Sequence, residues 1–107
     1  MRCFLGYITT SSLEEAKKIA RHLLERRLIA CANIYPQVES MFWWEGKIDK
    51  ATEVVLIIKT SGHRLAEIEK EVLKIHSYNC PCVVFLPIHE GHGPFLEWIQ
   101  QEIKEEN

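Results

Sequence analysis

Hydrophobic positions that recur every three or four residues along the chain predict three helices. Over residues 12–27 apolar side chains return every three or four positions, and Ser12 with Glu15 forms a capping box at the start. The same spacing predicts a second helix that is capped by Ser61 and ends near His76. Pro94 is suited to the first turn of a third helix. We expect its inward-facing side chains to be Phe95, Leu96, Ile99 and Ile103.

Four further segments are short, apolar and rich in β-branched or aromatic residues, which is typical of strands. They are residues 2–8, a long stretch 28–44 with a bend or bulge at Pro36, a stretch from Ile48 through 53–59, and residues 82–88. The single glycine in the short polar gap 44–47 predicts a hairpin between the second and third strands. Pro87 indicates that the end of the last strand lies at an edge of the sheet or outside the ladder.

The order β-α-β-β-α-β, followed by a helix, predicts an α+β fold of the ferredoxin-like type. This fold is a sandwich of one four-stranded antiparallel sheet with two helices on one face, and we expect residues 1–107 to form one domain. Bulky groups at Met41–Trp44 point to both faces of the sheet. Such apolar surface outside the core predicts assembly with other copies.

Charge and composition narrow the classes of partner. The 107 residues carry a formal net charge of −2 with interspersed signs, so a broad basic face for nucleic acid or anionic membranes is not expected. The first residues reach polar Thr9–Ser12 too early for a secretion signal, which predicts a cytoplasmic protein. Its four cysteines are therefore expected to be thiols, free or metal-bound, rather than disulfides.

Several strings of residues, in this order and spacing, resemble the CutA family of small divalent-cation tolerance proteins. They are residues 28–34 (LIACANI), 43–47 (WWEGK), Glu53 with Lys59-Thr60, 76–81 (HSYNCP) and 95–98 (FLEW). The resemblance implies a ferredoxin-like subunit that assembles into a stable cytoplasmic homotrimer. It also implies a role in tolerance of copper and other divalent metals, without an established reaction. The family's trimer is similar to that of PII signalling proteins, which bind small ligands in clefts between subunits.

The resemblance also implies copper ligands, but only one of them matches this chain. Copper binding in the family has been ascribed to a cysteine at the end of the first strand and to histidines after the second helix. Here the first strand ends in Gly6-Tyr7-Ile8-Thr9, and only His76 matches after the second helix. Cys3 lies too early to replace the missing thiol.

A local group just before the last strand offers soft ligands for a metal ion. His76, Cys80 and Cys82 supply one imidazole and two thiolates, which suit copper first and zinc second. The alternative is that Cys82 packs as a small apolar residue and Cys80 is an incidental loop thiol. His89, Glu90 and His92 are a weaker candidate group, on a glycine-containing loop.

Four other residues suggest a cleft between subunits. Lys59 and Glu53 could fix a polar ligand while the aromatic side chains of Trp44 and Tyr78 cover it, or all four could serve interface packing. No nucleophile elbow, phosphate-binding loop or zinc-protease motif occurs, so no enzyme is predicted. The prediction is a homotrimer that binds transition-metal ions in metal tolerance, with a PII-like sensor of a small metabolite or anion as the alternative.

Overall fold

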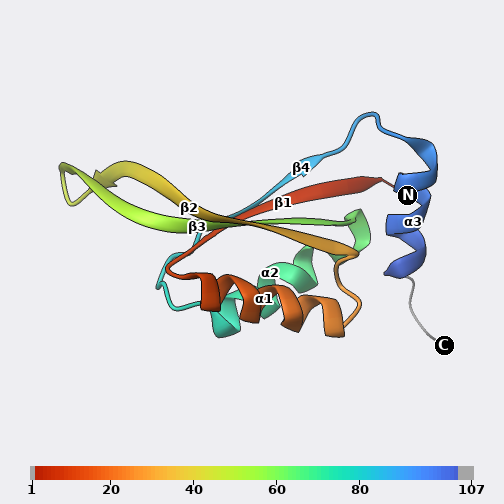
Figure 1. Ribbon diagram of the computed structural model, residues 1–107, viewed down its shortest axis with the longest axis horizontal. Coiled ribbons are helices and arrows are strands. Elements are labelled where there is room, and N and C mark those ends of the chain that lie inside the picture. Colours follow the sequence, from red (N-terminus) through yellow and green to blue (C-terminus); the bar gives the residue numbers. More distant parts are fainter. Residues whose placement is uncertain (1, 104–107) are drawn as a thin grey trace.

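Four antiparallel strands form a single sheet in the order β2-β3-β1-β4 (Figure 1). The structure is a computed structural model that describes residues 2–103. Its elements are β1 (Cys3–Thr10), α1 (Leu13–Glu25), β2 (Cys31–Trp44), β3 (Lys47–Ser61), the short 3-10 helix η1 (Gly62–Arg64), α2 (Leu65–Ile75), β4 (Val83–Pro87) and α3 (Gly93–Glu102). This is the predicted α+β order, and the predicted C-terminal helix is present.

The main core lies between one face of the sheet and the helices α1 and α2, which Figure 1 shows side by side beneath it. Alternation along each strand places every second side chain on this face. Ile8, Leu56 and Ile58 are fully buried there against Ile19 and Leu23 of α1. The opposite face of the sheet is not covered by α1 or α2, and we call it the helix-free face.

The last helix packs at one end of the sheet, close to the start of β1 (Figure 1). Ile99 and Ile103 are buried in a second, smaller cluster with Cys3, against Leu96 and Ile88. Phe95 is 40% exposed instead of inward-facing, and it stacks on Trp98 at 5.5 Å between ring centroids. The predicted inward position of Phe95 is therefore wrong.

The hairpin of β2 and β3 continues far beyond the helices and forms a two-stranded arm, residues 38–52, at the left of Figure 1. A register shift between Tyr35 and Val38 adds one residue to β2, as the bend at Pro36 predicts. A two-residue turn with positive φ at Glu45 (50°) and Gly46 (79°) closes the predicted hairpin.

Several predicted boundaries move, and two of these shifts have a clear physical cause. The second strand begins at Cys31 rather than residue 28, because Arg27 turns the chain at φ 56° and Leu28 N–H donates to the Leu23 carbonyl at 3.0 Å. Leu28 and Ile29 then enter the core from this turn. Ser61 does not cap α2: it ends β3, and its hydroxyl contacts His63 Nδ1 at 2.9 Å.

No helix within residues 2–103 is long and apolar enough to cross a membrane.

Candidate functional site

The loop of residues 76–82, between α2 and β4, carries most of the predicted site residues. Three consecutive positions tie it to three other elements: His76 to the end of β1, Ser77 to α1 and Tyr78 to β3. Each contact joins residues at least 25 positions apart in the sequence. The loop is thus held by the tertiary structure although it contains no regular element.

Both ring nitrogens of His76 are used by this network. Nε2 lies 2.8 Å from the Thr9 carbonyl oxygen, which can only accept, so Nε2 donates. Nδ1 then accepts the Tyr78 backbone N–H at 3.1 Å. The imidazole side chain has no exposed surface and its Nδ1 is 3.6 Å from Glu15 Oε2. This arrangement defines a neutral tautomer without a nitrogen lone pair directed to solvent.

Glu15 is a central member of this network, although the sequence pattern placed it only in a capping box. Its N–H donates to the Ser12 hydroxyl at 3.1 Å, as a capping box requires. Its carboxylate instead accepts from the Ser11 N–H at 2.9 Å and from the Ser77 N–H at 2.7 Å. Burial alone raises the pKa of Glu15, but these backbone donors outweigh it and lower the pKa from 4.5 to about 2.

Tyr78 and Glu53, both predicted cleft residues, contact each other. The Tyr78 hydroxyl donates to Glu53 Oε2 at 2.8 Å, and Glu53 is buried. Burial first, and then this bond to the carboxylate, raises the pKa of Tyr78 to about 12. The hydroxyl therefore remains a donor at neutral pH and fastens the loop to β3.

Cys80 and Cys82 are both exposed, free thiols at the end of the loop. Cys82 Sγ faces the Tyr7 carbonyl oxygen at 4.0 Å, and burial of the thiol, with the nearby Glu53 carboxylate, raises its pKa. Within residues 2–103, no three His, Cys, Asp or Glu side chains gather as a metal-binding group. The structure thus does not bring His76, Cys80 and Cys82 together as the predicted ligand triad.

The remaining two cleft residues lie elsewhere in the subunit. Lys59 is on β3, where its ammonium donates to the Asn33 side chain. It shares the helix-free face with Glu53, but six strand residues separate them by roughly 20 Å. Trp44 is exposed at the tip of the arm. One subunit therefore does not join Trp44, Lys59 and the Tyr78–Glu53 pair into a single site.

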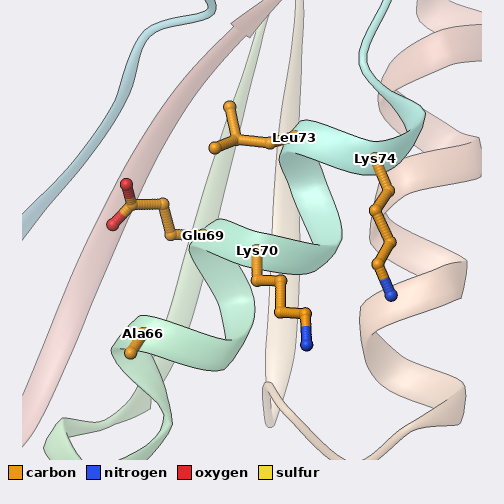
Figure 2. A pocket seen from close by; sticks show the side chains of 5 residues that line it. All are labelled: Ala66, Glu69, Lys70, Leu73 and Lys74. Atoms are coloured by element: carbon orange, nitrogen blue, oxygen red, sulfur yellow. The ribbon is translucent and has the colours of Figure 1, made fainter.

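Two other surface features offer little to a ligand. His89 and Glu90 are almost fully exposed, with His89 Nε2 4.0 Å from Glu90 Oε1. A shallow depression on α2, drawn in Figure 2, is lined by residues of that helix alone: Ala66, Glu69, Lys70, Leu73 and Lys74. The lysine side chains point away from Glu69 and Leu73 in that view, so no opposing wall encloses a ligand.

Comparison with known proteins places the chain among small metal-tolerance proteins. The family model for "CutA1 divalent ion tolerance protein" matches residues 4–102. The divalent-cation tolerance protein CutA of Archaeoglobus fulgidus is 50% identical over 98 residues, which cover 92% of this chain and 95% of that protein.

Solved structures show that the similarity in sequence extends to the fold. The structure of the Archaeoglobus fulgidus protein, there described as periplasmic, superposes with a TM-score of 0.91 at 48% identity and covers 97% of this chain and 100% of its own. The structure of CutA1 from Oryza sativa gives a TM-score of 0.94 at 36% identity, with 99% of this chain and 97% of that chain covered.

Proposed function

The chain belongs to the CutA1 divalent ion tolerance protein family, and on that premise we propose that it acts in metal tolerance as a cytoplasmic homotrimer. In this proposal it binds transition-metal ions, copper before zinc, and catalyses no reaction. The single observation that carries the assembly is the apolar surface that the arm and the helix-free face leave open in one subunit.

The arm supports assembly because both of its faces carry large apolar side chains. Trp43 pairs with Ile48 across the hairpin, and Met41 lies two residues away on the same face. Met41 is 75% exposed and Trp43 74%. Phe42 and Trp44 project from the other face. Apolar surface of this extent is costly in water, and burial against other copies offsets that cost.

The sheet edges and the helix-free face add to this support. Within residues 2–103, β2 pairs only with β3 and β4 only with β1, so both edges have free backbone groups. Val84 and Leu86, both half exposed, alternate along β4 on the helix-free face. In a closed ring of three copies, pairing of such edges would satisfy the free backbone groups. Contact between the copies would bury these apolar side chains.

The cytoplasmic location draws support from the cysteines. All four are free thiols, a state that a reducing compartment maintains. Cell fractionation of the native protein tests this proposal, and recovery with a periplasmic marker would contradict it.

The alternative function is that of a PII-like trimer that binds a small metabolite or anion between subunits. The observation in its favour is the Tyr78–Glu53 hydrogen bond, a polar pair next to the base of the arm. In a trimer, Lys59 or Trp44 of another copy could complete a cleft that one subunit lacks. Lys59→Ala should then abolish ligand binding and leave metal uptake unchanged.

Native mass spectrometry of the reduced protein tests assembly and metal binding together. The protein is measured alone and after titration with Cu(I), Cu(II) and Zn(II). We expect a trimer that takes up copper in whole steps. A monomeric mass at micromolar concentration would contradict the assembly. A trimer that stays bare with all three ions would favour the small-ligand alternative.

A further inference from the structure

We propose that a depression at the α3 end of the subunit binds a small zwitterion with an apolar side chain, of the class of free aliphatic α-amino acids. The depression has a volume of about 430 Å³, which is within the range of small-molecule sites. Its lining comes from the start of β1, the segment after β4 and one face of α3. The proposal goes beyond metal tolerance, because it uses none of the residues predicted as metal ligands.

The floor of the depression is apolar and held by hydrogen bonds between distant segments. Ile88, directly after β4, donates its N–H to the Cys3 carbonyl at 2.9 Å. The buried Cys3 thiol donates to the Leu96 carbonyl at 3.6 Å and accepts from the Gln100 side-chain amide at 3.3 Å. Ile88 and Leu96 pack against the same small core cluster. The floor is therefore formed before a ligand arrives.

One face of α3 supplies both floor and rim. Leu96, Glu97 and Gln100 share this face, because residues three and four positions apart lie on the same side of a helix. Ile99, on the neighbouring face, is fully buried and anchors the helix to the end of the sheet. The helix thus places an apolar side chain at the floor and a carboxylate at the rim.

The rim carries one positive and one negative side chain. Arg2 and Glu97 are both exposed and both line the depression, with the exposed His89 between charged and apolar parts of the lining. Within residues 2–103 neither Arg2 nor Glu97 forms an ion pair, with the other or with a third residue. Their charges are therefore available to a ligand that lies between them.

This pair of charges selects the class of ligand. A simple anion would be repelled by the Glu97 carboxylate and a simple cation by the Arg2 guanidinium, so charge complementarity favours a molecule with both signs. An α-amino acid carries a carboxylate for Arg2 and an ammonium group for Glu97. An aliphatic side chain on the same molecule would cover the floor at Ile88 and Leu96.

The depression lies outside the surface proposed for assembly. Figure 1 shows α3 at the end of the sheet opposite the arm. Cys3 belongs to the helix-free face by strand alternation, but α3 of the same chain already covers it. The pairing of β4 with β1 ends at Pro87, so a strand added at the free edge of β4 would end before the segment that begins at Ile88.

The test is isothermal titration calorimetry of the full, metal-free chain in its native assembly with free leucine. We expect saturable binding of one leucine per chain. Glycine keeps both charges but lacks the side chain, and it should bind at least about tenfold more weakly. Leucinol lacks the carboxylate and N-acetylleucine lacks the ammonium group, and each should bind about tenfold more weakly than leucine.

Two variants connect each charged group of the ligand with its residue. Arg2→Gln should abolish the difference in affinity between leucine and leucinol, and Glu97→Gln should abolish that between leucine and N-acetylleucine. Both side chains are exposed, so neither substitution should unfold the chain. Arg21→Gln and Glu90→Gln are the matched controls, with side chains 81% and 87% exposed outside the depression, and should leave every affinity unchanged.

Chemical-shift mapping by NMR gives a second readout, which locates the ligand in the wild-type chain. Leucine should move the amide signals of residues 2–3, 88–89 and 96–100 and leave those of the arm unchanged. No saturable binding of leucine, equal affinities of the wild type for leucine and both analogues, or shifts in the arm alone would overturn the proposal. Metal uptake is measured separately, so none of these results would bear on the metal-tolerance function.

Discussion

The Tyr78 hydroxyl and the buried Glu53 carboxylate, 2.8 Å apart, join the loop after α2 to the strand β3. The bond matters because Glu53 directly follows the arm segment of β3, while the loop after Tyr78 leads to the two exposed thiols. One hydrogen bond thus connects the loop that carries most of the predicted site residues with the proposed assembly surface. Its removal is the most direct test of the network.

Tyr78→Phe should lower the free energy of unfolding by about 1–3 kcal/mol, because Glu53 then remains buried without this donor. Urea unfolding followed by circular dichroism measures the change. Leu73→Ala is the control, since Leu73 is 51% exposed on α2, outside the proposed interface, and its replacement should change the free energy of unfolding by less than about 0.5 kcal/mol. Equal effects of the two substitutions would refute a specific role for the Tyr78–Glu53 bond.

The low pKa of Glu15 predicts a pH dependence of stability. Its folded-state pKa of about 2 lies below the ordinary value of 4.5, so the ionised carboxylate stabilises the fold above pH 4.5. That contribution is lost as the pH falls from 4.5 toward 2. Glu71, whose pKa is also lowered to about 2 by hydrogen bonds from His22 and Lys74, acts in the same direction.

Glu15→Gln should therefore flatten the plot of unfolding free energy against pH between 2 and 4.5. At neutral pH the substitution should cost about 1–2 kcal/mol, because an amide accepts the Ser11 and Ser77 N–H groups less strongly than a carboxylate. Parallel curves for the variant and the wild type would show that another group controls acid stability.

Trp43→Ser should shift the protein from trimer to monomer without unfolding the subunit. Trp43 is 74% exposed on the arm, outside the core between the sheet and the helices. Light scattering coupled to size-exclusion chromatography measures the mass. Leu73→Ser removes an apolar residue that is 51% exposed on α2, outside the proposed interface, and should leave the trimer intact. Dissociation by Leu73→Ser but not by Trp43→Ser would move the interface to the helices.

Gly6→Ala should destabilise the subunit by about 1–3 kcal/mol, the range typical of overpacking. A Cβ at this position would meet Ile58 Cγ1 at 2.5 Å, and Ile58 is fully buried with little room to move. Gly93→Ala is the control, because a Cβ there meets no atom within 4 Å. Thermal unfolding of both variants compares them, and an equal melting temperature would contradict the close approach of β1 and β3.

The elements and their order could be predicted from the sequence, because the signals for them are local. The apolar period of residues 13–25, the turn at Glu45 and Gly46, and the bend at Pro36 each depend on neighbours in the chain. The sequence also placed Tyr78 and Glu53 in one predicted cleft, together with Lys59 and Trp44. The order of strands and helices then left few topologies, and the ferredoxin-like arrangement is the one observed.

Which of the candidate side chains are available for function depends on contacts that form only when the chain folds. The sequence pattern predicts His76 as a metal ligand, yet one of its nitrogens donates a hydrogen bond to the carbonyl of Thr9, 67 positions away in the sequence. The sequence pattern predicts Glu15 as part of a helix cap, yet its carboxylate accepts a hydrogen bond from the N–H of Ser77, 62 positions away in the sequence. Lys59 and Glu53 read as one cleft, yet the extended strand holds them far apart. Hydrogen bonding and burial between distant segments arise only on folding, so no local pattern encodes them.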